Sequence, residues 1–265
     1  MKFIDFRREF HRYSQNKLWE IFEEYFKKDR AELLLDFSID HDQEDDLRKI
    51  IKSSEKEPLA YIFNRKTFFK RDFYVDRNVL IPREETEGLV QRALKLNPKK
   101  ILDMCTGSGA IAITLSLELN REVDAVDISR GAIEVATKNR DKLGAKVNFI
   151  ESDLFTNVEK KYDLIISNPP YIKEEDYMEL QEIHCEPKIA LLAEEDGIYF
   201  YRKIISQADK YLEKYGYLLF EIGYDQREKL IELANRYNYQ VIYVEKDLSS
   251  YDRYVLLKRL LWVKI

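Results

Sequence analysis

Cysteine and histidine are scarce in this chain of 265 residues, which contains 2 Cys and 3 His. Cys105 and Cys185 stand far apart, so the sequence has neither a disulfide framework nor the close Cys and His spacing of a zinc site. We therefore expect no bound metal. We also expect the protein to work in a reducing cytoplasm.

Long apolar runs are missing as well. No stretch approaches the roughly 20 apolar residues that a membrane-spanning helix needs. The first residues, MKFIDFRREFHRY, alternate charged and aromatic side chains and lack the apolar centre of a signal peptide. The formal net charge of −5 gives no overall positive potential for nucleic acid. We expect neither a membrane nor a direct nucleic-acid partner.

Glycine is absent from the first 87 residues, which favours helices over a sheet in this region. Apolar side chains recur three and four residues apart in two runs: Phe3, Phe6, Phe10 and Tyr13, then Leu18, Ile21, Phe22 and Tyr25. A third helix is expected around residues 31–37. Acidic residues at 42–46 predict the first turn of a fourth, running to Ile51. We expect residues 1–64 to form a helical bundle that either recognises the substrate or only braces the larger domain.

Residues 65–82 change to an aromatic-rich pattern of period two, which predicts a β-hairpin that links two domains. The turn-prone residues Asp76, Arg77 and Asn78 lie within this stretch. Pro82 then stands where a helix can begin, and acidic residues follow it in the opening turns. This helix is expected to continue through Leu94.

From Lys100 onward, predicted strands and helices alternate. Strands are expected at residues 101–102, 123–126, 147–150, 164–167 and 217–222, and β-rich segments close the chain at 241–244 and 254–257. Helices are expected at 110–119, 132–143, 197–212 and 230–237, with a long loop from the fourth strand through Pro187. This order predicts a doubly wound, Rossmann-like α/β domain over residues 83–265. Ligands of such domains bind at the carboxyl ends of the strands.

One candidate site is the stretch Asn168-Pro169-Pro170-Tyr171, which follows the apolar run 164–166 at the end of a predicted strand. Proline has no backbone N–H, and it pushes the residue before it toward an extended conformation. The segment therefore leaves backbone carbonyls free beside the Asn168 amide oxygen. Two acceptors and a ring suit a flat, conjugated –NH2 group, such as a carboxamide or an exocyclic base amine. The alternative is a proline-rich turn with no chemical role.

The second candidate site is the loop Cys105-Thr106-Gly107-Ser108-Gly109, after the first strand of the domain. Its two glycines allow a tight turn close to a ligand, but a dinucleotide fingerprint needs a third, so NAD fits poorly.

Two carboxylates accompany this loop at the ends of predicted strands. Asp127 ends the next strand, where it can accept hydrogen bonds from two ribose hydroxyls. Asp103 precedes the loop and either holds the turn or contacts a methionine ammonium, directly or through water. An acidic residue at each strand end around a two-glycine loop suits S-adenosylmethionine as the cofactor.

Nine segments carry a resemblance to a known family: PLAYI (58–62), LIPREETE (80–87), CTGSGAIA (105–112), SDLF (152–155), NPPYI (168–172), EP (186–187), DG (196–197), EIGYDQ (221–226) and DR (252–253). With these, nearly the whole chain resembles the HemK-type N5-glutamine methyltransferases, which modify the Gly-Gly-Gln loop of peptide chain release factors. Asn-Pro-Pro-Tyr alone also marks adenine-N6 methyltransferases. Two departures, Glu84 for a frequent proline and Ser249-Ser250 for a frequent glycine, lie away from the expected chemistry.

The resemblance implies a class I S-adenosylmethionine-dependent methyltransferase fold and a role for each candidate residue. It implies that Cys105 to Gly109 and Asp127 bind the cofactor, with Leu154 near the adenine. It also implies that Asn168 and the Pro169 carbonyl hold the glutamine –NH2, with Pro170 and Tyr171 against the substrate. The implied partners are class I release factors, and the protein is expected to be a monomer.

Two other functions share parts of this pattern. An adenine methyltransferase acting on nucleic acid would use the same cofactor and clamp but needs base flipping and a basic groove. The acidic balance and the lack of an obvious target-recognition segment count against it. A non-catalytic adaptor, binding a translation factor through its helical domain, is the third reading. The intact Asn168, Asp127 and Gly107 argue against that one.

Overall fold

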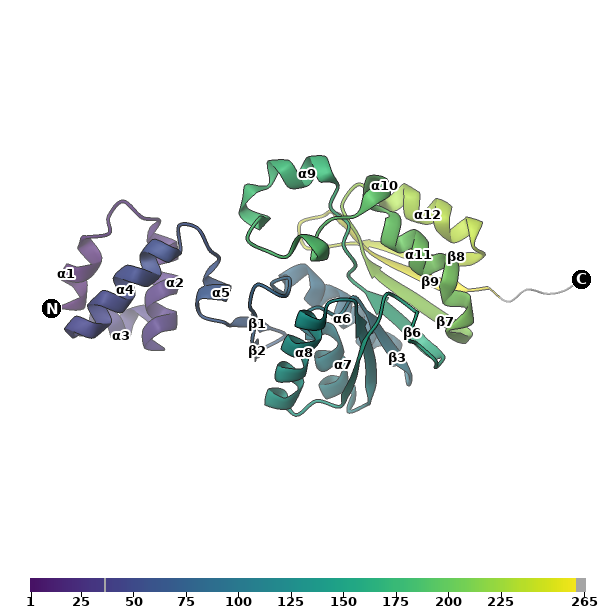
Figure 1. The fold of residues 1–265 in the computed structure, drawn as a ribbon, viewed down its shortest axis with the longest axis horizontal. Helices are drawn as coiled ribbons and strands as arrows, with labels where there is room; N and C mark the ends of the chain where they lie inside the picture. The colour runs from purple at the N-terminus through teal and green to yellow at the C-terminus, as the bar shows by residue number, and fades with distance from the viewer. Residues whose placement is uncertain (36, 261–265) are drawn as a thin grey trace, which may run out of the picture. The chain divides into compact units, whose positions relative to one another are not determined.

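The computed structural model describes residues 1–35 and 37–260 (Figure 1). Its contacts divide the chain into two compact units, the first ending at Asn64 and the second beginning at Arg65. The segment 65–82 therefore falls in the second unit. None of the helices in the described ranges is long and apolar enough to cross a membrane.

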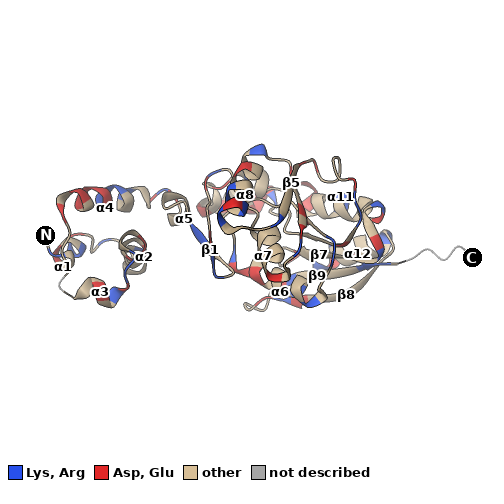
Figure 2. Ribbon diagram, turned by 90° about the horizontal axis from the view of Figure 1, so that it is seen from below, with Lys and Arg blue, Asp and Glu red and all other residues tan. Residues whose placement is uncertain are grey.

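The first unit is helical, as the sequence predicts. Its helices are α1 (Phe3–Arg8), α2 (Gln15–Phe26), α3 (Arg30–Leu34), α4 (His41–Ser53) and α5 (Leu59–Ile62). A capping box opens α4, because the Asp40 side chain accepts from the Gln43 N–H and the Gln43 side chain accepts from the Asp40 N–H. The acidic first turn of α4 is visible in Figure 2, at the end where the helix dipole favours negative charge.

Aromatic side chains fill the core of this unit. Phe3 and Phe22 are fully buried and meet edge to face, with ring centres 4.9 Å apart. The Arg7 guanidinium lies over the Trp19 ring, 4.4 Å from its centre. The expected helix at 31–37 begins at Arg30 and ends at Leu34. Residue 36 of that prediction lies outside the described residues.

The second unit opens with the predicted hairpin, formed by β1 (Lys66–Phe68) and β2 (Arg71–Phe73). The turn-prone residues 76–78 lie after β2 and do not form the turn of the hairpin. Phe69 and Lys70 make it instead, with φ of 48° and 64°, the left-handed pair of a tight hairpin turn. The helix predicted near Pro82 is α6 (Glu84–Leu96), which begins two residues later.

Within the described residues, a sheet of seven strands forms the centre of the second unit. Its spatial order is β5-β4-β3-β6-β7-β9-β8. The strands are β3 (Ile101–Met104), β4 (Val123–Asp127), β5 (Val147–Glu151), β6 (Tyr162–Ser167), β7 (Leu212–Glu221), β8 (Tyr239–Lys246) and β9 (Asp252–Arg259). The pairs among β3 to β7 are parallel, whereas β9 runs antiparallel to both of its neighbours. The doubly wound prediction is confirmed.

Helices cover both faces of this sheet (Figure 1). One face carries α6, α7 (Ala110–Leu119) and α8 (Arg130–Leu143), and the other carries α11 (Tyr199–Gln207) and α12 (Arg227–Arg236). Each face has its own buried apolar core. The helix predicted at 197–212 is too long, because Leu212 already pairs with Tyr162 as the first residue of β7.

The long loop after β6 contains more structure than the sequence predicts. It holds α9 (Glu174–Glu179), α10 (Glu194–Gly197) and two short 3-10 helices, Gln181–Ile183 and Lys188–Ala190; a third, Ala208–Lys210, follows α11. The two ends of the loop meet, since Ile172 N donates to Leu191 O at 2.9 Å and Ala193 N donates to Ile172 O at 2.9 Å. The loop therefore leaves the end of β6 and returns to it.

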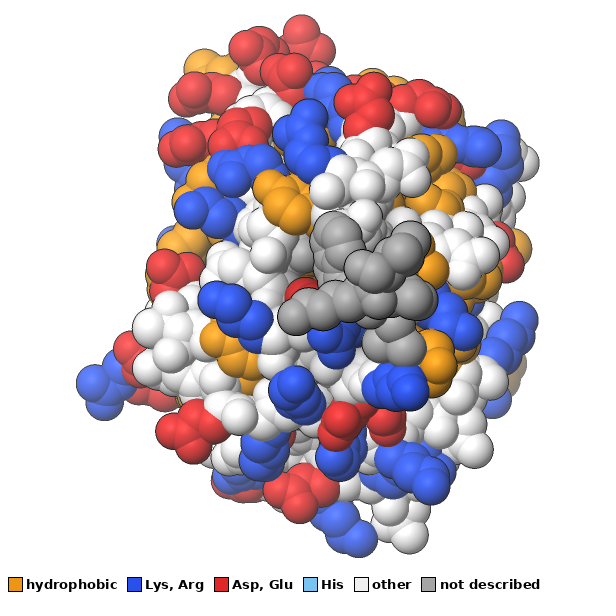
Figure 3. Space-filling view, turned by 90° about the vertical axis from the view of Figure 1, so that its right-hand side faces the viewer, with side chains coloured by type: hydrophobic (Ala, Val, Ile, Leu, Met, Phe, Trp, Pro, Cys, Tyr) orange, Lys and Arg blue, Asp and Glu red, His pale blue; other side chains and the backbone are white. Residues whose placement is uncertain are grey.

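The surface carries charges of both signs. On the face shown in Figure 3, Lys and Arg side chains are interspersed with Asp and Glu, and hydrophobic side chains form separate patches. This mixture extends along the helices of the second unit (Figure 2). No continuous basic stripe is visible on the parts of the molecule that these views show.

Candidate active site

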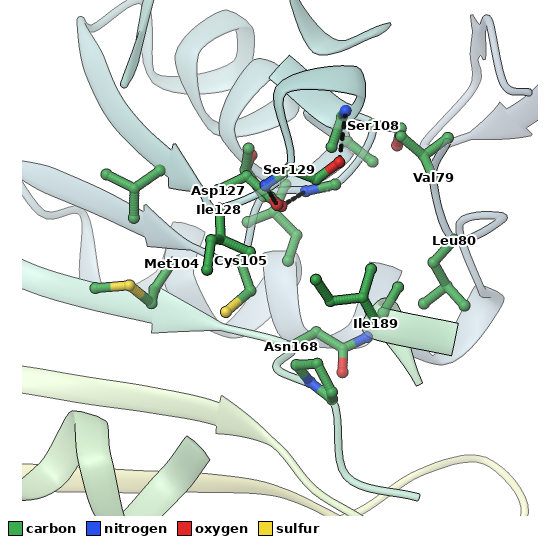
Figure 4. Close-up of a pocket in the computed structure, with 18 of the residues that line it drawn as sticks. Val79, Leu80, Met104, Cys105, Ser108, Asp127, Ile128, Ser129, Asn168 and Ile189 are labelled. Carbon is green, nitrogen blue, oxygen red and sulfur yellow. Dashed lines mark hydrogen bonds between the residues drawn. The ribbon is translucent and has the colours of Figure 1, made fainter. Parts of the chain in front are cut away.

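The ends of three neighbouring strands come together at one edge of the sheet. Met104 at the end of β3 pairs with Val126 in β4 on one side and with Ser167 in β6 on the other. The chain leaves β3 toward α7 on one face and leaves β6 toward the other, which is where open α/β sheets form ligand crevices. A cleft of about 1060 Å³, including its open mouth, lies here (Figure 4).

The loop between β3 and α7 lines the floor of this cleft from Cys105 through Ser108. It needs left-handed backbone at three positions: φ is 61° at Cys105, 54° at Gly107 and 80° at Gly109. A Cβ at Gly109 would also lie 3.0 to 3.2 Å from side chains of three neighbours. Only glycine suits that position, whereas Cys105 adopts a conformation that most side chains avoid.

Asp103 is fully buried at the end of β3 and does not line the cleft. One of its oxygens, Oδ2, accepts from the Thr106 hydroxyl at 2.6 Å and from the Ala112 N–H at 3.2 Å. Its other oxygen, Oδ1, is buried without a partner. Burial raises the pKa of the Asp103 carboxyl to about 7, although both hydrogen bonds lower it. Of the two predicted roles, these contacts match the one that holds the turn.

Asp127 ends β4 and lines the cleft, as Figure 4 shows. Its Oδ2 accepts from the Gly107 N–H at 2.8 Å, and its Oδ1 accepts from the Ser129 N–H at 2.9 Å. Burial raises the pKa of this carboxyl, and the backbone donors lower it. A carboxylate has about four acceptor positions, so each oxygen keeps room for one hydroxyl donor from a ligand.

Asn168 follows β6 and points its amide toward the cleft, across from the glycine loop (Figure 4). Its Nδ2 donates to the Thr86 hydroxyl at 3.2 Å. Thr86 in turn donates to the buried Glu221 carboxylate at 2.8 Å. Pro170 lines the cleft with Asn168, whereas Pro169 is buried outside its lining.

Tyr171 packs against the apolar core on the α11 and α12 face of the sheet and does not line the cleft. Burial raises the pKa of its hydroxyl well above the ordinary value. Its backbone oxygen accepts from the Gln226 side chain at 3.0 Å, and Gln226 also donates to the Gly197 oxygen at 3.1 Å. A Cβ at Gly197 would lie 2.4 Å from the Gln226 Nε2 and 2.4 Å from the Tyr171 backbone oxygen, so only glycine fits at this position.

The remaining walls come from segments outside the strand ends. Leu154, with φ of 47°, lines one side of the cleft after β5. Beside it, the Ser152 N–H donates to the backbone oxygen of Asp127 at 2.8 Å. The segment before α6 forms another wall through Val79, Leu80 and Pro82. Ile189, Ala190 and Phe200 close the cleft from the loop after β6 and from α11.

One buried carboxylate ties two of these walls together. Glu186 accepts from the Ile81 N–H at 2.9 Å and forms an ion pair with Arg83. The sequence analysis gave no role to these three residues, or to Thr86 and Glu221, although all five lie in the segments that carry the family resemblance. That position in the resembling segments was the only signal for them.

Replacing Asp103 by Asn is expected to change how stability depends on pH. The folded pKa of Asp103, about 7, is above its ordinary value. The neutral carboxyl therefore makes its whole contribution to stability at low pH, and this contribution is lost as pH rises through 7. Asp103→Asn lacks the effect. Its unfolding free energy relative to wild type should rise between pH 4 and 7.5, by at most about 4 kcal/mol, because one pKa unit corresponds to about 1.4 kcal/mol.

Urea unfolding at several pH values measures this difference. Asp141→Asn, on the exposed side of α8, is the matched control and should follow wild type. A constant difference between Asp103→Asn and wild type across this range would contradict the prediction.

Three comparisons relate this fold and cleft to known proteins. A family model described as Methyltransferase small domain matches residues 84–194. The release factor glutamine methyltransferase of Fusobacterium nucleatum is 38% identical over 79% of this chain and 62% of its own length, so this chain spans less than two thirds of that relative. The release factor glutamine methyltransferase of Bacillus cereus is 38% identical over 86% of this chain and 87% of its own length.

A solved structure agrees with the fold. The 16S rRNA N2 G1207 methyltransferase of T. thermophilus, in complex with AdoMet and guanosine, matches with a TM-score of 0.53 over 74% of this chain and 50% of its own, at 14% identity. At that identity the likeness shows the class I methyltransferase fold alone. The identity to the Bacillus cereus protein, which extends over most of both chains, shows more: this chain belongs to the family of release factor glutamine methyltransferases.

Proposed function

We propose that the protein transfers a methyl group from S-adenosylmethionine to the side-chain amide nitrogen of the glutamine in the Gly-Gly-Gln motif of class I release factors. The observation that carries this proposal is one cleft that holds Asp127 and the glycine loop on one side and the Asn168 amide on the other. Release factors act in the cytoplasm, so we expect a cytoplasmic enzyme, and we expect it to be a monomer.

The residues of the cleft fit S-adenosylmethionine. Asp127 has acceptor room on both oxygens for the two ribose hydroxyls, and Leu154 offers an apolar side for the adenine. Asp103, buried beneath the loop, supports this side of the cleft by accepting from the Thr106 hydroxyl and the Ala112 N–H. When bound, the cofactor supplies an electrophilic methyl carbon on a positively charged sulfur.

Asn168 supplies the acceptor for the substrate amide. Because its Nδ2 donates to Thr86, its Oδ1 is the end left to accept from the glutamine –NH2. The Pro169 carbonyl, which follows without a competing N–H from Pro170, is the second proposed acceptor. Pro170 packs beside them in the cleft.

These acceptors address the difficulty of the reaction. An amide nitrogen is a poor nucleophile, since its lone pair is delocalised into the carbonyl. Acceptors on both of its hydrogens stabilise the more polarised nitrogen that forms as the bond to the methyl carbon forms and the carbon–sulfur bond breaks. Holding the nitrogen in line with that carbon lowers the entropic cost. The extra proton then leaves to water, so no general base is required.

The experiment that tests the proposal is a labelled methyl-transfer assay. Purified class I release factors and duplex DNA are offered separately with labelled S-adenosylmethionine, and the label is located by mass spectrometry. Label on the Gly-Gly-Gln glutamine alone supports the proposal. Label on DNA adenine would support a nucleic-acid methyltransferase, and label on neither would leave the cleft without this activity.

Asp127→Ala is expected to weaken cofactor binding while the fold stays intact. A hydrogen bond to a charged group contributes on the order of 1.5–3 kcal/mol, so affinity should fall roughly ten- to a hundred-fold. Calorimetry with S-adenosylmethionine measures the change, with Asp141→Ala as an exposed control. Unchanged affinity in Asp127→Ala would remove this carboxylate from the cofactor site.

Asn168→Ala is expected to abolish most methyl transfer and leave cofactor affinity near normal, because the amide acts on the substrate. Loss of a positioned group of this kind costs on the order of 2.7–4 kcal/mol, or roughly a hundred- to a thousand-fold in kcat. Turnover on saturating release factor is the measurement, with Asn235→Ala on the exposed side of α12 as control. Turnover within a few-fold of wild type would rule out the amine clamp.

We propose that residues 1–64 select the release factor. Every protein surface offers glutamines, and the clamp reads only a carboxamide and its near surroundings. Contacts remote from the chemistry can position the reacting group, so their loss affects rate as well as affinity. A chain that begins near Arg65 should bind S-adenosylmethionine normally but methylate a whole release factor far more slowly.

A short Gly-Gly-Gln peptide supplies the control for this truncation. It should be a poor substrate for both chains and should lose little when residues 1–64 are removed. Normal cofactor affinity checks that the shortened chain is folded. Equal rates of the two chains on the whole release factor would indicate that the helical unit is only a brace.

A further inference from the structure

Beyond the clamp itself, the structure joins Asn168 to a buried carboxylate through one hydroxyl. We propose that Thr86 and Glu221 are positioning residues, which set the direction of the Asn168 amide so that its oxygen faces the substrate. This inference rests on the proposed function. It concerns two residues that the clamp mechanism described above leaves without a role.

The three residues come from separate elements that the fold brings together. Ser167 in β6 pairs with Phe220 in β7, so Asn168, the residue after β6, is level with Glu221 at the end of β7. Thr86 reaches them from the first turns of α6. Thr86 is 5% exposed and Glu221 is 1% exposed, so water does not replace their hydrogen bond. The chain Asn168 Nδ2 to Thr86 Oγ1 to Glu221 Oε2 has steps of 3.2 and 2.8 Å.

The direction of the amide follows from what each group can donate. An ionised carboxylate only accepts, so it takes the single hydroxyl proton of Thr86. The Thr86 oxygen is then an acceptor, and only the –NH2 end of Asn168 can face it. The reversed amide would set two oxygens against each other with no proton between them. Ionised Glu221 therefore turns the Asn168 oxygen toward the cleft.

The surroundings of Glu221 explain how its charge is tolerated and when it is lost. Its charged neighbours are Arg253 on β9 and, at the start of α6, Arg83 and Glu85. The Tyr201 hydroxyl on α11 donates to the backbone oxygen of Glu221 at 2.9 Å. Burial raises the pKa of Glu221 to about 7, while Thr86 and Arg253 lower it and Glu85 raises it.

Protonation removes the constraint on the amide. Neutral Glu221 can donate to the Thr86 oxygen, which frees the Thr86 proton for the Asn168 oxygen and lets the amide reverse. The –NH2 end would then face the substrate –NH2, and both groups are donors. Because the pKa of Glu221 is above its ordinary value, the ordered arrangement dominates above pH 7 and is lost as pH falls through 7. Methyl transfer should fall with it.

Three variants test the proposal by their kinetics on a release factor. Thr86→Val keeps the shape and removes the hydroxyl, and kcat should fall roughly ten- to a hundred-fold, because a hydrogen bond to a charged group is lost and two partners are left unpaired. Its affinity for S-adenosylmethionine should stay within three-fold of wild type. Thr86→Ser restores the hydroxyl and should recover most of the lost kcat. Glu221→Gln should lower kcat at pH 8 and lose the decline below pH 7.

Thr114→Val is the matched control for Thr86→Val. Thr114 is fully buried in α7, and its hydroxyl has no partner, so this variant also replaces a buried hydroxyl by a methyl group. Its kcat should equal that of wild type. Thermal melts and cofactor affinity establish that each variant is folded. If Thr86→Val turned over within three-fold of wild type, or if Thr86→Ser were as slow as Thr86→Val, the proposal would be wrong.

A second measurement separates failure of this proposal from failure of the proposed function. The side-chain –NH2 signals of Asn168, assigned by their loss in Asn168→Ala, are followed by ¹⁵N NMR in the protein without substrate. In wild type they should shift between pH 6 and 8. In Glu221→Gln they should stay constant. Asp103, whose pKa is also raised to about 7, is still present in this variant, so constant signals would show that the shift in wild type comes from Glu221. Signals independent of pH in wild type would overturn the relay, whatever the substrate; a wild type that leaves release factors unmethylated would overturn only the function.

Discussion

The parallel alignment of β3 with β4 and β6 is the constraint on which the site depends. Because Met104 is level with Val126 and Ser167, Cys105, Asp127 and Asn168 follow at the same edge of the sheet. Asp127 can then reach the Gly107 N–H, and Asn168 faces the same loop from the other side. A shift of one residue between these strands would reverse the side chains and separate the glycine loop from Asn168.

Local patterns predicted the centre of the sheet well because β3, β4 and β6 are short runs buried on both faces. Helix α7 was predicted from Ala110 to Leu119 as observed. The hairpin turn was not predictable in this way. Phe69 and Lys70 have no preference for left-handed backbone, but packing of Phe68 against Phe73 and the hydrogen bond from the Phe69 N–H to Glu87 hold the turn there. Residues 76–78 also form a turn, since the Val79 N–H donates to the Asp76 oxygen at 3.2 Å, but this turn lies after β2 and not between the two strands of the hairpin.

The candidate site was predictable from the sequence where its residues lie at the ends of strands or in the loops that follow them. The glycine loop, Asp127 and Asn168 could be found from residue type and order, and the structure brings them into one cleft. The pairing of Thr86 with Glu221 could not be predicted from residue type and order, because 135 positions separate them and neither lies in a local pattern that indicates a site. The same holds for Glu186 and Ile81, which are joined across 105 positions.

Burying carboxylates at this edge of the sheet is costly, and the cost argues for function. Asp103 and Glu221 are both removed from water, and burial raises the pKa of each to about 7. A core of apolar residues would stabilise the fold at least as well as such buried charges. An ionised carboxylate only accepts hydrogen bonds, so it fixes which way its hydroxyl and N–H partners point. Asp103 thereby orients the Thr106 hydroxyl and the start of α7, and Glu221 orients Thr86. Each buried carboxyl thus sets the hydrogen-bond direction on one side of the cleft, beneath the glycine loop and behind the Asn168 amide.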